Sequence, residues 1–212
     1  MFKLDLHVHS KYSTDNDAEP EEIVLRAIER GLHGIAFTEH YSYAASEPIE
    51  SLREKYADSI TILRGVECSA AEGHCLVFGV NTDGMDLNGA PAAVLVALVN
   101  QAGGVVIPSH PFRPGTSLGS LVLSVKGIAA LEGCNGANMH SYNAKAIESA
   151  AALRLPYTGG SDAHMPQEVG SCYTEFMEAV TDQNFINLLK AGNYRGVDTR
   201  KVPRFPFNLG KW

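Results

Sequence analysis

Hydrophobic and polar residues alternate strictly at the start of the chain. In the segment 2–9, FKLDLHVH, the aliphatic side chains point to one side and the acidic and imidazole side chains to the other. This period of two predicts a β-strand with one polar face. The polar face carries Asp5, His7 and His9.

A helical period follows this strand. Pro20 suits a first helical position, the apolar residues of PEEIVLRAIERG recur on one face, and Gly31 predicts the end of the helix. A second strand, GIAFTEH at 34–40, comes directly after it. The chain therefore begins with a strand, a helix and another strand.

Strands and helices continue to alternate along the rest of the chain. We predict helices at 48–56, 91–102, 143–154 and 182–191, the last capped by Thr181 and ended by Gly192. We predict further strands at 60–68, 75–80, 104–108, 128–132, 156–160 and 172–176. This order is typical of βα units around a mainly parallel sheet, and about seven strands in one domain favour a closed α/β barrel over an open sheet.

The composition agrees with a single domain. With 212 residues, 45% of them hydrophobic, the chain can bury one core, which we assign to 1–200, and 201–212 have the composition of an irregular tail.

The net charge of −7 argues against nucleic acid as a partner. No apolar run approaches the roughly 18 residues of a membrane span, and Lys3 and Asp5 stand where a signal peptide is apolar. We therefore expect a cytoplasmic protein with no membrane partner, and the sequence gives no indication of its oligomeric state.

The cysteines are far apart and form no Cys-x-x-Cys pair. Each of them lies in or beside an apolar strand, so we expect buried, reduced thiols rather than disulfides. They are Cys68, Cys75, Cys134 and Cys172.

Histidine and carboxylate side chains gather at the ends of the predicted strands. In a barrel of parallel strands the carboxyl ends form one rim, so residues that are distant in sequence converge there. All of the candidates except His74 lie at such a strand end. The candidates are His7, His9, His40, Glu67, His74, His110, Asp162 and His164.

These residue types point to a multinuclear metal site. Imidazole and carboxylate groups suit zinc, manganese or iron. The pair His7-x-His9 aims both rings to one side of its strand, and Asp162-x-His164 repeats the arrangement. Glu67 can bridge two cations with its two oxygens and hold them about 4 Å apart.

Each histidine also has a simpler interpretation. A single histidine at a strand end is more often structural than a ligand, but the whole set would leave many buried charges that repel each other unless cations compensated them. His33 follows the glycine that ends a helix and is expected at the surface. His140 falls in a predicted polar loop and is a candidate for lining the mouth of the site.

An ordered set of motifs extends along nearly the whole chain: DLHVHSKYSTD (5–15) followed by PEEIVLRA, then TEH (38–40), GVECSA (65–70), His74 before a strand, SHP (109–111) and GGSDAH (159–164). With these motifs the chain resembles the PHP family, the polymerase and histidinol phosphatase superfamily. The resemblance implies a distorted (β/α)7 barrel, similar to a TIM barrel, with up to three metals.

The resemblance also implies which residues hold two to three divalent ions of zinc, manganese or iron. Glu67 is shared between two of the three ligand groups, which is the bridging role expected from its chemistry. The groups are His7, His9, Glu67 and Asp162 for the first metal, Glu67, His74 and His110 for the second, and Asp15, His40 and His164 for the third.

Two positions depart from the family pattern. The usual Thr-Asp-His triplet reads Thr38-Glu39-His40, which lengthens one acidic side chain by a methylene and leaves Glu39 as an altered or supporting residue. Asp15 stands where some relatives place histidine, so the third site is richer in oxygen and better suited to manganese or iron than to zinc.

We predict that metal-activated water hydrolyses a small phosphomonoester at this site. Arg113, in SHPFR, suits a bidentate grip on phosphate, with a solvated loop charge as the alternative, and Lys11 is a weaker candidate of the same kind. Asp162 is a candidate acceptor for the proton of the attacking water, although a metal-bound carboxylate is a poor base.

Other functions remain open at this point. Only 35 residues separate His74 from His110, and 51 separate His110 from Asp162, which leaves no room for an inserted lid domain and favours a small substrate. Phosphodiesterase or exonuclease activity ranks second, after hydrolysis of a small phosphomonoester. A metal-dependent C–N hydrolase of the amidohydrolase type and a metal-binding domain without turnover are the others.

Overall fold

A curled sheet of seven strands, in the order β5-β4-β3-β2-β1-β8-β9, forms the largest part of the fold, and β6 and β7 form a separate parallel pair. The computed structural model describes residues 1–201. The strands are β1 (Phe2–Val8), β2 (Gly34–Phe37), β3 (Thr61–Ala70), β4 (Gly73–Phe78), β5 (Val105–Pro108), β6 (Leu131–Asn135), β7 (Tyr157–Gly160), β8 (Cys172–Phe176) and β9 (Tyr194–Asp198). The helices are α1 (Pro20–Glu29), α2 (Glu50–Lys55), α3 (Ala92–Gln101), α4 (His140–Leu153) and α5 (Phe185–Ala191).

Backbone hydrogen bonds place the β6–β7 pair between β1, an inner strand of the seven-stranded sheet, and β5, which lies at one end of it. On one side the residues after β7 join the end of β1, because the Asp162 amide donates to the His7 carbonyl at 2.7 Å and the His9 amide donates to the Ala163 carbonyl at 3.1 Å. On the other side the Ala129 amide donates to the Val106 carbonyl of β5 at 2.9 Å. The strands that carry the candidate ligands are thereby drawn around one space.

The structure confirms a single α/β domain, whereas the predicted count of seven strand–helix units is not confirmed. Among the strands of residues 1–201, only β1–β2, β2–β3 and β6–β7 pair in parallel, and the other four strand pairs are antiparallel. The β3–β4 pair is a hairpin with Ala70 opposite Gly73, and so short a turn cannot contain the crossover helix that parallel strands require.

This hairpin explains why His74 stands at the beginning of its strand. Because β4 runs antiparallel to β3, the first residues of β4 lie at the same rim as the last residues of β3, and His74 pairs with Ser69. His74 and Glu67 share one face of the hairpin, since side chains alternate between the two faces of a sheet. His74 therefore reaches the same space as the residues at the carboxyl ends of the parallel strands.

Several predicted boundaries shift. The predicted strand at 128–132 is β6, which begins at Leu131, and β9 was not predicted. The helix expected at 182–191 begins at Phe185, because Thr181 and Asn184 close a turn before it through reciprocal side-chain bonds. Of the predicted tail at 201–212, all but the first residue lies outside the described residues.

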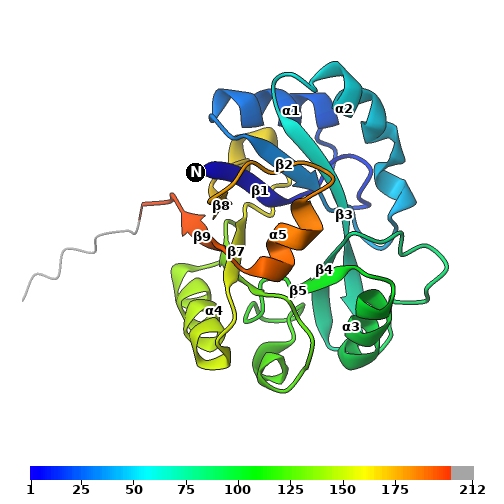
Figure 1. Cartoon of the computed structure of the whole chain (residues 1–212), viewed down its shortest axis with the longest axis vertical. Coiled ribbons are helices and arrows are strands. Elements are labelled where there is room, and N and C mark those ends of the chain that lie inside the picture. The colour runs from blue at the N-terminus through cyan, green and yellow to red at the C-terminus, as the bar shows by residue number, and fades with distance from the viewer. Residues whose placement is uncertain (202–212) are drawn as a thin grey trace, which may run out of the picture.

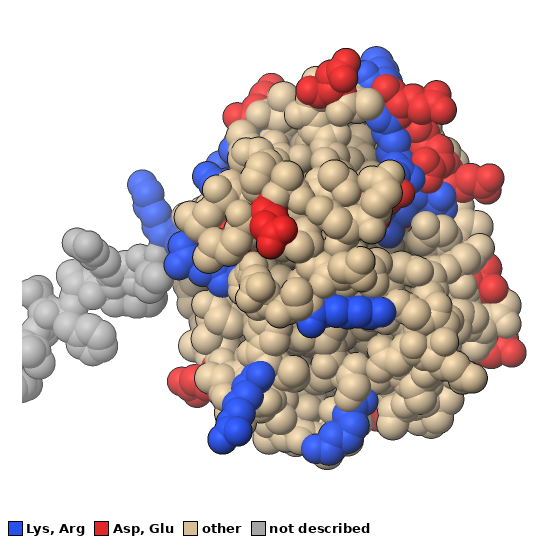
Figure 2. Space-filling model, in the orientation of Figure 1, with Lys and Arg blue, Asp and Glu red and all other residues tan. Residues whose placement is uncertain are grey.

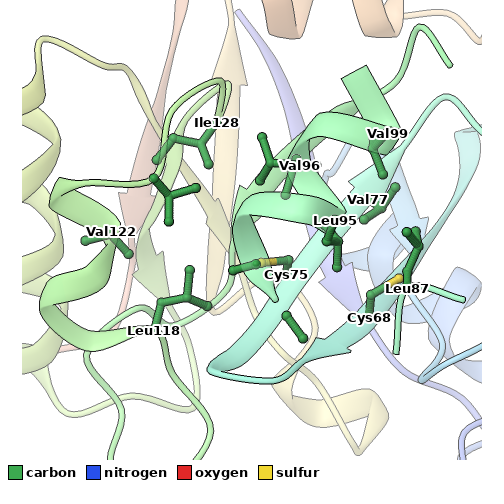
Figure 3. Close-up of a cluster of buried hydrophobic side chains, with 14 of the residues drawn as sticks. Cys68, Cys75, Val77, Leu87, Leu95, Val96, Val99, Leu118, Val122 and Ile128 are labelled. Atoms are coloured by element: carbon green, nitrogen blue, oxygen red, sulfur yellow. The ribbon is translucent and has the colours of Figure 1, made fainter. Parts of the chain in front are cut away.

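Helices surround the strands and enclose the core. Figure 1 shows α1 and α2 together at the top, α3 and α4 at the bottom, and α5 in front of the strands. Cys68 and Cys75 face away from Glu67 and pack with Leu95 and Val99 of α3 in one apolar cluster (Figure 3). The described cysteines are all buried and free, which confirms the expected reduced thiols, and burial raises the pKa of Cys68 to about 12.

The surface carries both signs of charge. On the face shown in Figure 2, acidic side chains gather around α2 together with basic ones, and isolated basic side chains are spread over the lower half. Within residues 1–201 no helix has the length and apolar character needed to cross a membrane.

Asp5 fastens β1 to the segments that follow β7. It is fully buried, and its carboxylate accepts hydrogen bonds from the amides of Ser161 at 2.8 Å, Gly170 at 2.8 Å and His7 at 3.3 Å. Burial raises the pKa of Asp5 to about 6, against the lowering effect of these hydrogen bonds.

We expect Asp5→Ala to lower the free energy of unfolding by about 3 kcal/mol, because buried amides lose their acceptor. Urea denaturation of the two proteins measures the difference. Asp17→Ala, at an exposed carboxylate, is the matched control and is expected to change stability little. Equal stabilities for the Asp5 variant and the original protein would contradict this role.

Candidate metal centre

Two imidazole rings at the end of β1 aim at one point. The Nε2 atoms of His7 and His9 lie 3.1 Å apart, and both side chains are fully buried. Their other ring nitrogens are occupied, since His7 Nδ1 lies 2.8 Å from Glu132 Oε1 and His9 Nδ1 lies 3.2 Å from Ser13 Oγ. With a proton on each Nδ1, both Nε2 lone pairs are directed into the same space.

Two carboxylate oxygens complete a four-atom cage around this point. Glu67 Oε2 and Asp162 Oδ1 each lie 3.4 Å from both Nε2 atoms. A tetrahedral cation with bonds of about 2.1 Å separates its ligand atoms by about 3.4 Å. These five separations between ligand atoms, 3.1 to 3.4 Å, therefore fit a bound cation.

Glu67 faces a second group of imidazoles with its other oxygen. Its Oε1 lies 3.0 Å from His110 Nε2 and 3.3 Å from His74 Nδ1, and it also accepts a hydrogen bond from Ser109 Oγ at 2.7 Å. Glu67 thus contributes one oxygen to each of two neighbouring groups of nitrogen atoms. This is the geometry required of a carboxylate shared by two cations.

A third group surrounds Asp15 on the more exposed side. Asp15 Oδ2 lies 3.2 Å from His40 Nε2 and 3.4 Å from His164 Nε2. His164 Nδ1 is held by the Asp162 carbonyl at 3.0 Å, which leaves its Nε2 free to face Asp15.

His40 lies between the second and third groups. Its Nδ1 faces Glu67 Oε2 at 3.3 Å, and its Nε2 faces Asp15. The buried Nδ1 has no hydrogen-bond partner within the described part of the chain, and a cation would satisfy it. The structure therefore brings all of the predicted ligands together and places His40 within ligand distance of Glu67 and His74 as well as of the predicted third group.

The buried charges in this cluster depend on one another. Burial by itself raises the pKa of Glu67, but the charge of His7 and the hydrogen bonds of His110, His7 and His74 outweigh it and hold the pKa well below its usual value. Burial also raises the pKa of Asp162, but other effects, of which the charge of His7 is the largest, hold that pKa well below its usual value. The carboxylates thus stay ionised and require positive charge, from protons or from metal ions.

Metal uptake should consequently depend on pH. Burial lowers the pKa of His9, but hydrogen bonds to Asp162 and Glu67 outweigh it and raise the pKa to about 9. Below that pH a cation must displace the His9 proton, and the pKa of His7 is also raised well above its usual value, so we expect the apparent metal affinity to rise by about tenfold or more per pH unit up to about pH 9. Zinc titrations with a pH indicator measure both affinity and proton release, and an affinity independent of pH between 7 and 9 would contradict this linkage.

The predicted substrate contacts lie at different distances from the cluster. Arg113 is closest, because its guanidinium bonds Asp162 Oδ2, Asn135 Oδ1 at 2.8 Å and Asn138 Oδ1 at 2.9 Å. Lys11 pairs with Glu19 at 2.7 Å, both side chains being exposed. His140 is the first residue of α4, not part of a loop, and its Nδ1 lies 3.3 Å from Asp198. The substrate-binding and catalytic roles stay predictions.

The sequence did not single out Glu132, which supports two ligands. It is fully buried at the beginning of β6; its Oε1 bonds His7 Nδ1, and its Oε2 accepts the His110 amide at 2.6 Å and Asn135 Nδ2 at 2.9 Å. The signal was present, because Glu132 is a carboxylate at the end of a predicted strand, like the ligands themselves.

The exposed surface position expected for His33 is confirmed.

Taken together, the barrel-like α/β fold and the clustered imidazoles and carboxylates define a protein with a candidate site for several metal ions. The model of the PHP domain matches residues 5–113, and the model described as PHP-associated matches residues 140–194. The chain belongs to the PHP family.

Individual proteins are similar to this chain in sequence or in fold. A probable phosphatase, YcdX, of Escherichia fergusonii is 25% identical over 211 residues, covering 85% of this chain and 84% of the relative. PsfC of Pseudomonas syringae shares the fold with a TM-score of 0.71 and 22% identity, over 96% of this chain and 93% of PsfC. An amidohydrolase of Chromobacterium violaceum, with bound sulfate and no metal, shares it with a TM-score of 0.64 and 19% identity, over 87% and 95% of the two chains.

Proposed function

We propose that this protein hydrolyses a small phosphomonoester with water activated by two or three divalent cations. The position of Glu67 carries this proposal. One of its oxygens belongs to the cage of His7, His9 and Asp162, while the other faces His74 and His110. When bound, such a pair of cations lowers the pKa of water and stabilises charge on phosphoryl oxygens.

The residues around the cage hold the ligands in place for this chemistry. Arg113 and Asn135 bind Asp162 Oδ2, so that Oδ1 stays directed at His7 and His9. Glu132 holds the His7 ring in the tautomer that presents Nε2 to the cage. These contacts support fixed ligand positions before substrate arrives, which limits the reorganisation needed during reaction.

Differences in exposure indicate the side from which substrate arrives. The side chains of His7 and His9 are 0% exposed, whereas those of His164 and Asp15 are 36% and 52% exposed. A phosphate would therefore meet the third ligand group first and then the deeper cage. The segments between β4 and β5 and between β6 and β7 fold as α3 and α4, which supports an open site for a small substrate.

The competing activities make different demands on the same site. A C–N hydrolase of the amidohydrolase type uses a carbamylated lysine as the bridging ligand, and here Glu67 occupies the bridging position. Phosphodiester hydrolysis needs the same cations but a longer binding surface. The small phosphomonoester is favoured because Arg113 and Lys11, the two cationic side chains predicted to contact substrate, are already paired with Asp162 and Glu19 and offer little charge to a longer polyanion.

The test is to purify the protein with manganese or zinc, measure bound metal by elemental analysis, and assay phosphomonoesters, phosphodiesters and amides side by side. We expect two to three metal ions per chain and turnover of phosphomonoesters that chelators abolish. Turnover of amides alone would overturn the proposal, and so would metal binding without any hydrolysis. Preferential turnover of diesters would replace phosphatase by phosphodiesterase.

A further inference from the structure

Glu39 is a buried carboxylate that does not face any of the three ligand groups. Its side chain is 0% exposed. It accepts hydrogen bonds from the Ser10 amide at 3.1 and 3.2 Å, from the Ser10 hydroxyl and from the Ser13 hydroxyl. Burial raises the pKa of Glu39, and the two serines oppose that rise.

The Ser13 hydroxyl connects Glu39 to the cage. Its oxygen lies 3.2 Å from His9 Nδ1 and accepts a hydrogen bond from the His40 amide at 3.1 Å. The hydroxyl has one proton, and an ionised carboxylate can only accept. Since Ser13 donates to Glu39, its oxygen must accept from His9, which places a proton on His9 Nδ1 and leaves the Nε2 lone pair for the cage.

We propose that Glu39 and Ser13 act as a positioning pair that fixes the tautomer and orientation of His9, and with them the metal affinity of the cage. The proposal rests on the proposed metal site. His7 is held directly by a carboxylate, Glu132, whereas His9 is held by a carboxylate acting through a hydroxyl.

Ser10 provides a matched control for Ser13. Both hydroxyls donate to Glu39, but of the two only the Ser13 oxygen contacts His9. Ser10→Ala and Ser13→Ala therefore remove the same kind of bond from Glu39, and only Ser13→Ala removes the acceptor for His9 Nδ1. Glu39→Gln keeps the side-chain length but can donate to Ser13, which frees the hydroxyl proton to point at His9.

The experiment measures zinc affinity by competition with a chelator, together with the nitrogen NMR shifts of the His9 ring in the zinc-loaded protein. We expect Ser13→Ala and Glu39→Gln to weaken zinc binding by about 10- to 100-fold and to shift the His9 Nδ1 resonance. Ser10→Ala should bind zinc within about threefold of the original protein and keep its His9 spectrum.

Two results would overturn the proposal and are distinguishable from each other. If the original protein binds zinc through His9 and Ser13→Ala binds it as tightly as Ser10→Ala, the positioning pair fails and the metal site stands. If zinc binds without changing the His9 resonances, both the pair and the proposed cage fail. A fold check by circular dichroism on all variants ensures that a lost affinity is not caused by unfolding.

Discussion

Glu67→Gln is expected to abolish metal-dependent hydrolysis while leaving the fold intact. The substitution keeps the length of the side chain but removes the charge, and an amide cannot give one anionic oxygen to each of two ligand groups. Because Glu67 faces His7 and His9 with Oε2 and His74 and His110 with Oε1, both groups lose their shared ligand. We expect kcat/KM to fall by about 10³-fold or more, since each cation contributes several kcal/mol to the transition state.

Elemental analysis and initial rates on the same preparation measure the effect. Bound metal and activity should fall together, and the circular dichroism spectrum should not change. Glu47→Gln, at an exposed carboxylate, is the matched control for the loss of one negative charge. Full activity in Glu67→Gln would show that no cation is shared through this residue.

Asp162→Ala is expected to have the second largest effect. The change removes Oδ1 from the cage of His7 and His9, and it removes the carboxylate that the Arg113 guanidinium contacts. We expect activity to fall by about 10³-fold. Metal present at about 1,000 times its Kd raises the free energy of unfolding by about 4 kcal/mol and thereby raises Tm. We expect the variant to lose this metal-dependent rise in Tm.

Thermal unfolding with and without added zinc measures this loss directly, and it does not require a known substrate. Asp182→Ala is the control, because that carboxylate is 57% exposed and pairs with Arg53 away from the cage. An equal rise of Tm with zinc in Asp162→Ala and in the original protein would remove Asp162 from the metal site.

Much of the candidate site could be predicted from the sequence because its polar residues fall at the ends of strand-like runs. His7, Glu67, His110 and Asp162 each follow or end a strand-like run, and strand ends on one rim of a barrel must converge. Distances of 3.0 to 3.4 Å between Glu67 and its neighbours agree with that expectation. The polarity of the residues and the period of the strands were sufficient for this inference.

Supporting residues were harder to recognise. Ser13 and Glu39 are 26 residues apart in sequence, and nothing in their spacing predicts that both contact the surroundings of His9. Glu132 lies 125 residues from His7. Hydrogen bonds over such separations depend on side-chain directions within a packed core, which hydrophobic periodicity does not specify.

By itself the sequence indicated that strands and helices alternate within one α/β domain, that the thiols are buried, and which imidazoles and carboxylates are candidates for one site. Those conclusions follow from local patterns and from the chemistry of side chains, whereas Asp15 and the division into ligand groups were implied by the resemblance to the PHP family. The tertiary structure alone decided that β4 runs antiparallel, that His40 stands between two ligand groups, and that Glu39, Ser13 and Glu132 hold the ligand rings. These features are set by how strands pair and which buried groups satisfy one another, and pairing between distant segments is not encoded in any short stretch of chain.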